Sequence, residues 1–166
     1  MTFENKNLTI DEAFKIAVKN QQKNKIKEAQ ILYNKILEIN PNHSQAHYNL
    51  GLIFRKLGEF EKAKDCYENA IKINPNYSDA HKNLGIILYN LGEKQKAKDC
   101  YEKVIETNPN DIGALNDLGA IFLELGEYQK AKDCYEKVIE IDSNHIDALN
   151  NLGVIFNKLG EFEKAK

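Results

Sequence analysis

Amide side chains recur along the chain at a constant interval of 34 residues. The positions are Asn49, Asn83 and Asn151, with Asp117 interrupting the row and Lys15 one interval before it. An amide carries both a hydrogen-bond donor and an acceptor, so a row of amides can bond the backbone of an extended polypeptide whatever its side chains are. At Asp117 we expect this backbone recognition to weaken or to give way to a basic contact. The alternative is that these asparagines only solvate a helix face, since asparagine is abundant throughout the chain.

Three cysteines, Cys66, Cys100 and Cys134, repeat at the same interval. If they share one position on successive helices, which pack about 8–10 Å apart, their Cα atoms lie beyond the roughly 7 Å that a disulfide allows. The chain has no Cys-x-x-Cys pair, and no histidine shares the position of the cysteines, so the pattern does not predict zinc binding. We expect three free, half-buried thiols.

The positions of the histidines and the lack of known catalytic motifs argue against an enzyme. His47 and His81 are equivalent positions, where we expect packing or a hydrogen bond, and His43 and His47 lack a third metal ligand. The sequence has no G-x-S-x-G, P-loop, G-x-G-x-x-G or H-E-x-x-H motif. We therefore predict no catalytic residue, no metal site and no cofactor.

The same interval organises the whole sequence. Three prolines stand 34 residues apart, and eight of the nine glycines form pairs seven residues apart that repeat every 34 residues. A fixed period of this length is typical of stacked helical repeats. It divides the chain into a leader, residues 1–9, and a repeat domain, residues 10–166. The units of this domain are 10–43, 44–77, 78–111, 112–145 and an incomplete 146–166.

Each complete unit is predicted to form two helices. In the second unit the apolar residues follow the period of a helical face on both sides of Gly58, which suits the left-handed end of a helix. Pro75 ends the second helix of that unit. Gly51 lies inside the first helix, where glycine costs about 1 kcal/mol relative to alanine, so we expect the paired helix to approach it closely. Thr9 and Glu12 form a capping box that predicts a helix beginning at residue 10.

This pattern resembles the tetratricopeptide repeat (TPR). The matching residues in the second unit are Leu50, Gly51, Phe54, Gly58, Ala63, Tyr67, Ala70 and Pro75. The third and fourth units carry equivalents, although Ser143 replaces the proline of the fourth, and the first unit diverges most. The resemblance implies an all-α fold, a right-handed α-solenoid of stacked antiparallel helix pairs. It also implies non-catalytic recognition of proteins, in a concave groove that the first helices line.

The resemblance also assigns roles to residues of that groove. The row from Lys15 to Asn151 would bond peptide backbone, similar to the asparagine ladder of O-linked N-acetylglucosamine transferases. Side-chain selectivity would come from Tyr48, Arg55, Lys82, Asn116 and Asn150. A clamp for the C-terminal carboxylate of chaperones is rejected, because Asp117 would repel a carboxylate where such a clamp needs basic residues.

Composition narrows the partners to a protein or a peptide. The chain carries 23 Lys and Arg against 25 Asp and Glu, and this near-balance argues against general binding of nucleic acid or of anionic membranes. No apolar run is long enough to insert into a membrane and the N-terminus is polar, so we predict a cytoplasmic protein. The net charge falls from +2 over residues 1–43 to −4 over residues 112–145. This gradient either orients a partner or belongs to a solvated outer face.

The fifth unit stops inside its second helix. We therefore expect Leu152, Ile155, Phe156 and Leu159 to expose the apolar face of its first helix. This predicts either a fragment of a longer protein or self-association through the open C-terminal end. Three hypotheses follow: an adaptor that binds extended peptides, the substrate-presenting arm of a larger transferase, and a self-assembling scaffold.

Overall fold

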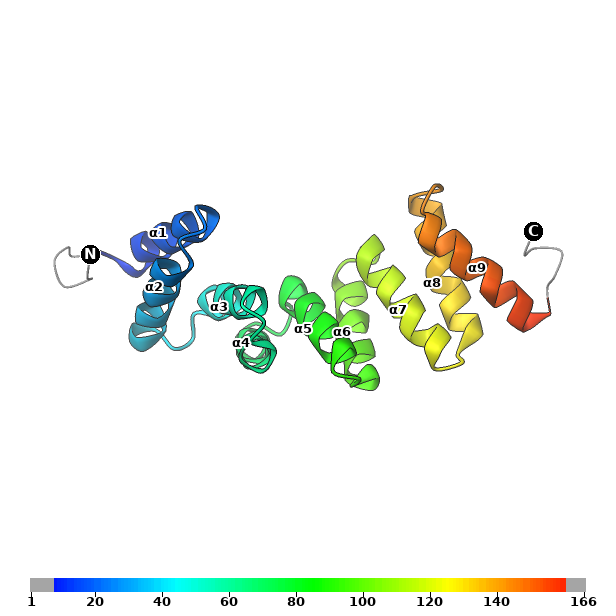
Figure 1. The fold of residues 1–166 in the computed structure, drawn as a ribbon, viewed down its shortest axis with the longest axis horizontal. Coiled ribbons are helices and arrows are strands. Elements are labelled where there is room, and N and C mark those ends of the chain that lie inside the picture. Colours follow the sequence, from blue (N-terminus) through cyan, green and yellow to red (C-terminus); the bar gives the residue numbers. More distant parts are fainter. Residues whose placement is uncertain (1–7, 161–166) are drawn as a thin grey trace. The chain divides into compact units, whose positions relative to one another are not determined.

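The computed structural model describes residues 8–160, and every regular element in this range is an α-helix (Figure 1). The prediction of an all-α chain is therefore confirmed. The helices are α1 (Ile10–Gln22), α2 (Ile26–Ile39), α3 (Ser44–Lys56), α4 (Phe60–Ile73), α5 (Ser78–Asn90), α6 (Lys94–Thr107), α7 (Ile112–Glu124), α8 (Tyr128–Ile141) and α9 (Ile146–Leu159). Most of the predicted leader, residues 1–7, and the end of the fifth unit, residues 161–166, lie outside the described residues.

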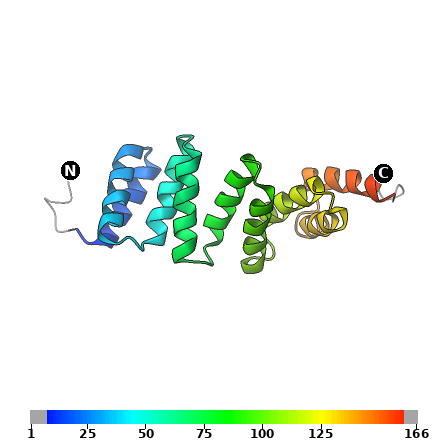
Figure 2. The ribbon, with the colours of Figure 1, turned by 90° about the horizontal axis from the view of Figure 1, so that it is seen from below.

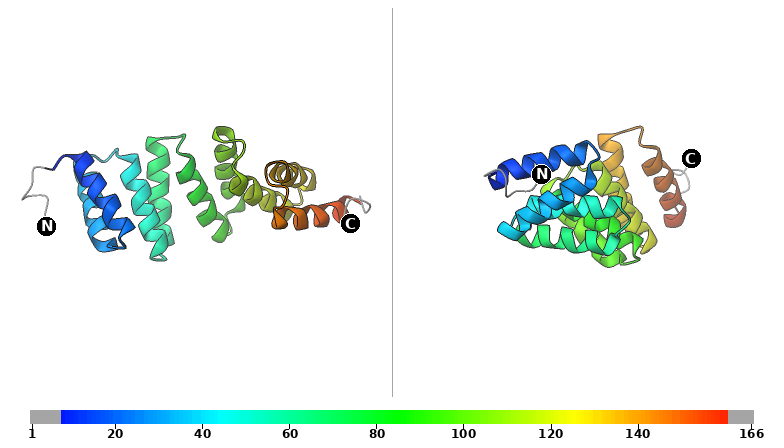
Figure 3. Two further views of the ribbon diagram at one scale, coloured as in Figure 1. Left: turned by 90° about the horizontal axis from the view of Figure 1, so that it is seen from above. Right: turned by 60° about the vertical axis from the view of Figure 1, so that its left-hand side comes forward.

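The chain forms two compact units, an N-terminal unit up to residue 80 and a C-terminal unit from residue 81. In the N-terminal unit, α1 packs against α2, α2 against α3, and α3 against α4 (Figure 2). In the C-terminal unit, α6 packs against α7, α7 against α8, and α9 against both α7 and α8 (Figure 3). Within each unit the helices therefore follow the predicted pattern of antiparallel pairs.

The turn inside each pair has the geometry that the glycine spacing predicts. Gly58 has a φ of +76°, in the left-handed region, and the backbone N–H of Glu59 reaches back to the carbonyl of Phe54 at 2.9 Å. The divergent first repeat, residues 10–43, has Asn24 at this place with a φ of +58°, and the backbone N–H of Lys25 donates to the carbonyl of Asn20 at 2.9 Å. Asparagine tolerates this conformation better than most residues with a side chain. The turn is therefore preserved although the glycine is not.

The predicted helix ends are confirmed at both kinds of boundary. Thr9 and Glu12 form a reciprocal capping box, and α1 begins at the next residue. Between pairs, the side chain of Asn74 accepts a hydrogen bond from the backbone N–H of Asn76 at 3.3 Å. Asp142 makes the equivalent contact with Asn144 at 3.1 Å, in the repeat 112–145, where Ser143 replaces the proline. The side chain that precedes the proline position therefore maintains this turn without the proline.

The glycines inside first helices lie against tyrosines of the paired helices. A Cβ atom placed on Gly51 would lie 2.5 Å from the ring of Tyr67, and one on Gly119 would lie 2.9 Å from the ring of Tyr135. These tyrosines are fully buried. Burying a tyrosine removes about 150–250 Å² from water, which is a large contribution for one side chain. The predicted close approach is confirmed, and it explains why glycine recurs where alanine is the better helix former.

The prediction for α9 is partly wrong. Leu152 and Ile155 are buried, with exposed fractions of 7% and 0%, because α9 packs against α7 and α8. Phe156 is half-buried, and Leu159 is exposed as predicted. The most exposed apolar side chain of this helix is Ile146, at 71%. The sequence identified an apolar helix correctly but assigned its uncovered face to two residues that the preceding pair covers.

Candidate peptide-binding surface

The five positions of the predicted row all lie on first helices. Lys15 is exposed on α1, and the other four are half-buried, one each on α3, α5, α7 and α9. The amide nitrogen of Asn49 donates to the backbone carbonyl of Gln45 at 2.9 Å. An amide group has a second N–H and a carbonyl oxygen. One contact within its own helix therefore leaves Asn49 with further capacity for hydrogen bonding.

In the C-terminal unit, the row contacts the buried tyrosines of the preceding pair. The amide nitrogen of Asn151 donates to the hydroxyl oxygen of Tyr135 at 3.0 Å. The hydroxyl of Tyr101 donates to the carboxylate of Asp117, sixteen residues later as well. These tyrosine partners were not predicted from the sequence. Their signal was a tyrosine that recurs with the same 34-residue interval and that needs a hydrogen-bond partner when its ring is buried.

Two of the predicted selectivity residues also have partners in their own unit. The ring of Tyr48 packs against Tyr67 and Tyr77, with ring centroids 5.9 Å and 4.9 Å away. Burial raises the pKa of Tyr77 to about 12, with a smaller contribution from the neighbouring Tyr48. At the equivalent position of the next unit, the ammonium of Lys82 lies 2.8 Å from the carboxylate of Asp111. This position therefore links its helix to the start of the following first helix in both units.

The pKa values of Asp111 and Asp117 are shifted in opposite directions, although Asp111 caps the start of α7 and Asp117 lies on the same helix. Burial alone would raise the pKa of Asp111, but the hydrogen bonds from Lys82 and from the backbone N–H of Ala114, together with the charge of Lys82, outweigh it, and the pKa is lowered. Burial raises the pKa of Asp117, in spite of hydrogen bonds from Tyr101 and Asn116 and the more distant charge of Lys82. Asp117 is thus a partly desolvated carboxylate whose nearest cation is bonded to another group.

The other predicted residues lie at similar places on the first helices. Arg55 and Asn116 are half-buried, on α3 and α7, and Asn83 is half-buried on α5. Asn150 is exposed on α9. Within the described part of the chain, the side-chain oxygen of Asn116 is buried without a hydrogen-bond donor.

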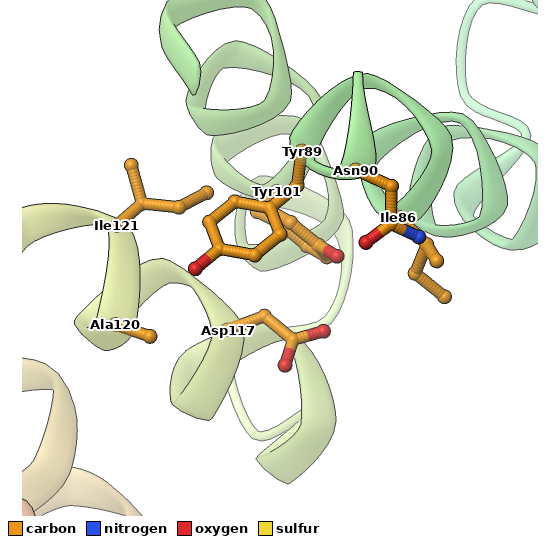
Figure 4. Close-up of a pocket in the computed structure, with 7 residues that line it drawn as sticks. All are labelled: Ile86, Tyr89, Asn90, Tyr101, Asp117, Ala120 and Ile121. Carbon is orange, nitrogen blue, oxygen red and sulfur yellow. The ribbon is translucent and has the colours of Figure 1, made fainter. Parts of the chain in front are cut away.

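A pocket of about 210 Å³ opens between α5 and α7, and we call it the α5–α7 pocket. It is lined by Ile86, Tyr89, Asn90, Tyr101, Asp117, Ala120 and Ile121. Figure 4 shows the carboxylate of Asp117 below the two tyrosine rings, with Asn90 and Ile86 on one side and Ala120 and Ile121 on the other. The pocket therefore combines one carboxylate with aromatic and aliphatic walls.

The N-terminal unit has a pocket of about 430 Å³ beside α1 and α3, which we call the α1–α3 pocket. It is lined by Gln21, Ile26, Leu52, Ile53, Arg55 and Lys56. The side-chain oxygen of Gln21 accepts a hydrogen bond from the buried hydroxyl of Tyr33 at 2.8 Å, and the ammonium of Lys56 donates to Asn24 at 2.7 Å. Its charged groups are two cations, so it differs in sign from the α5–α7 pocket.

The cysteines and histidines of the described residues have structural surroundings. The cysteines are free thiols, and burial raises the pKa of both Cys66 and Cys134 to about 11, with a smaller contribution from an adjacent aspartate. His43 accepts a hydrogen bond from the backbone N–H of Ala46 at 3.2 Å, so it caps α3. His47 contacts the backbone carbonyl of Pro41 at 2.9 Å. Between residues 8 and 160, no three metal-binding side chains lie close enough to hold an ion.

Repeated antiparallel helix pairs with a buried glycine–tyrosine contact define the chain as a helical repeat protein. Models of the tetratricopeptide repeat match residues 44–77, 78–111 and 113–145, and further models of this repeat match residues 14–43 and 134–166. The chain therefore belongs to the tetratricopeptide repeat family. The proteins of this family are protein–protein interaction modules, and they are generally non-catalytic.

Solved structures support the same assignment. The chain is 26% identical to YrrB, described as "a TPR protein with an unusual peptide-binding site", with a TM-score of 0.88 over 98% of this chain and 84% of YrrB. It is 27% identical to MamA, with a TM-score of 0.81 over 90% of this chain and 88% of MamA. PilF of Pseudomonas aeruginosa shares the fold, at 21% identity and a TM-score of 0.74 over 94% of this chain and 71% of PilF. A comparison with curated proteins finds no match to the chain.

None of the helices between residues 8 and 160 combines the length and the apolar character that crossing a bilayer requires.

Proposed function

We propose that the chain is an adaptor that binds extended peptide segments along its first helices. The observation that carries this proposal is the row of polar side chains at one repeat position, four of them half-buried, of which Asp117 lines the α5–α7 pocket. The likeness to YrrB, whose own description names a peptide-binding site, supports it. In this proposal the row contacts peptide backbone, and the pockets select side chains.

The hydrogen bonds of the row are compatible with this role. Asn49 uses one amide N–H on its own helix, and Asn151 uses one on Tyr135. Each amide keeps a carbonyl oxygen and a second N–H, which are the two groups that a peptide backbone needs. The tyrosine contact also holds the Asn151 amide in one orientation, which reduces the entropy lost on binding. The similarity to the asparagine ladder of O-linked N-acetylglucosamine transferases rests on spacing alone.

The selectivity residues divide into two groups under this proposal. Tyr48 and Lys82 are anchored by neighbours in their own units, so they shape the surface more than they adapt to a ligand. Arg55 lines a pocket, and Asn116 and Asn150 lie on α7 and α9 at the equivalent position to Lys82. We assign side-chain recognition to these three.

The test is a double variant, Asn49→Ala with Asn83→Ala, assayed with peptides selected from a random linear library on the unmodified protein. We expect peptide affinity to fall roughly tenfold, as the loss of about 1.4 kcal/mol implies. The matched control is Asn34→Ala with Asn69→Ala, which removes two exposed amides from the second helices α2 and α4. Circular dichroism checks that both variants keep their helices. Equal affinity of the two variants and the unmodified protein would exclude the asparagine row as the binding element.

A second candidate function is self-assembly through α9, and one comparison favours it. Leu149 is 47% exposed on α9, whereas its equivalent Leu115 on α7 is 3% exposed. Val154 is also exposed on α9. Such an apolar face suits another amphipathic helix. Light scattering of the Leu149→Lys variant tests it, since loss of a dimer would support self-assembly and a monomeric unmodified protein at high concentration would dismiss it.

We also propose a cytoplasmic location. The cysteine usage supports it, because three cysteines at one repeat position do not form the disulfide framework that is typical of small secreted domains.

A further inference from the structure

We propose that the α5–α7 pocket binds an arginine side chain of the bound peptide, with the carboxylate of Asp117 pairing with the guanidinium. The inference rests on the proposed peptide-binding function and adds the chemistry of one residue that the peptide must carry. Every residue of the pocket belongs to the C-terminal unit.

The first argument is the state of the Asp117 carboxylate. It accepts hydrogen bonds from Tyr101 and Asn116, and two carboxylate oxygens offer about four acceptor positions, so capacity is left. Lys82 is the nearby cation, but its ammonium lies 2.8 Å and 2.9 Å from the two carboxylate oxygens of Asp111. Among residues 8–160, no lysine or arginine forms an ion pair with Asp117. A partly buried carboxylate that lacks an ion pair attracts a cation strongly, because little water screens its charge.

The size and the walls of the pocket indicate one side chain. Its volume of about 210 Å³ lies below the roughly 300–1,000 Å³ of pockets that take drug-sized ligands. Ile86, Ala120 and Ile121 supply aliphatic walls that suit the methylene stem of a long basic side chain. Figure 4 shows the carboxylate between these walls and below the tyrosine rings, which is the arrangement that a cation on an apolar stem requires.

The tyrosine rings favour arginine over lysine. A guanidinium is planar, stacks on aromatic faces and can bond a carboxylate through two N–H groups at once, whereas an ammonium is a compact and strongly hydrated charge. Tyr89 is held in place because its hydroxyl donates to Glu124, which also forms an ion pair with Lys94 at 2.8 Å. Tyr101 is buried and donates to Asp117 itself. Both rings are therefore positioned before a ligand arrives.

The charge around the pocket agrees with a basic ligand. Residues 112–145, which include α7, carry a net charge of −4. Such a field raises the rate at which a basic segment associates and opposes an acidic one.

Asp117→Asn is the variant that tests the pocket, because it makes this position the same as in three other repeats. Asparagine stands at the positions equivalent to Asp117 in three other units, and Asn151 bonds its tyrosine there, so Asp117→Asn keeps the shape and a hydrogen-bonding partner for Tyr101. The control is Asp133→Asn on the second helix α8, which removes the same charge from an exposed position. The experiment selects peptides from a random linear library on the unmodified protein and on both variants, and measures affinities of the selected sequences.

We expect arginine to be enriched at one fixed place in peptides selected by the unmodified protein and by Asp133→Asn. Asp117→Asn should lose that enrichment and bind the arginine peptides about tenfold more weakly. Replacing the peptide arginine by lysine should weaken binding to the unmodified protein and change little in Asp117→Asn. Peptides without this enrichment, or enrichment that survives in Asp117→Asn, would overturn the pocket assignment and leave peptide binding intact.

A direct titration separates failure of the pocket from failure of peptide binding. N-acetyl-arginine amide is added to isotopically labelled protein, and amide resonances of α5 and α7 are followed by NMR. Shifts at the pocket that Asp117→Asn abolishes support the inference even if the library yields no peptide. No shift together with no selected peptide would reject both proposals.

Discussion

The two units carry pockets beside consecutive first helices, and the pockets differ in charge. The α1–α3 pocket presents Arg55 and Lys56, whereas the α5–α7 pocket presents Asp117 beneath two tyrosines. Leu52 and Ile53 of the first correspond to Ala120 and Ile121 of the second, two repeat intervals later. The repeated positions thus supply apolar residues to both pockets, and the positions that vary between repeats set the charge of each pocket.

A similar contrast holds at the position of Tyr48 and Lys82. In the N-terminal unit an aromatic cluster connects this position to Tyr77, and in the C-terminal unit an ion pair connects it to Asp111. The same position therefore contacts the start of the following first helix through aromatic packing in one unit and through an ion pair in the other. Apolar packing is insensitive to salt and pH, whereas an ion pair depends on both.

The largest expected effect compares how closely the paired helices approach in the two units, at Gly51 and at Gly85. We expect Gly51→Ala to lower the free energy of unfolding by about 2 kcal/mol, because its Cβ would lie 2.5 Å from the buried ring of Tyr67. Gly85→Ala should cost much less, since the nearest ring atom of Tyr101 is 3.0 Å away and alanine regains about 1 kcal/mol of helix propensity. Urea unfolding followed by circular dichroism measures both. Equal losses would show that the close approach is not what requires glycine.

Tyr48→Ala is expected to cost about 1.5 kcal/mol. The loss comes from two aromatic contacts, each typically worth about 0.5–1.5 kcal/mol beyond burial and only partly additive here. Unfolding in low and high salt should give the same loss. A loss that disappears in high salt would contradict an apolar role for Tyr48.

Lys82→Ala is expected to cost at most about 1 kcal/mol, since its side chain is 34% exposed. Its loss should shrink with salt and also with acid. Asp111 has a pKa below its usual value in the folded protein, so its stabilisation is full above the unfolded pKa of about 3.9 and is lost as the pH falls through the folded pKa. Thermal unfolding at neutral and at strongly acidic pH measures this. A loss that is the same at both would rule out the ion pair as its cause.

The smallest difference is expected between the cysteines of the two units. Burial raises the pKa of Cys66 and of Cys134 to about 11, against about 8.5 for a free cysteine. At pH 8 both thiols should therefore react with iodoacetamide far more slowly than free cysteine, and at similar rates. Mass spectrometry of the alkylated peptides reports each site. Fast alkylation of either thiol in the folded protein would mean that its helix opens readily.

Much of the fold was predictable from the sequence because it depends on local rules. Glycine at the left-handed turn, the Thr9–Glu12 capping box and the proline-flanked turns each act within a few residues, and their interval of 34 fixes the register of every helix. The glycine inside first helices even indicated the close helix approach. The site was predicted only in outline: its positions lie on the first helices, but their partners were not foreseen.

The sequence by itself determined the repeat, the helix ends and the polar character of the row. Tertiary structure decided which members of that row are already bonded, as Asn151 is to Tyr135 and Asp117 to Tyr101. It also decided that Leu152 and Ile155 are covered while Leu149 is exposed. The physical reason is that burial and ionisation depend on neighbours from other helices. A helical period shows which residues share a face, but only packing shows what that face meets.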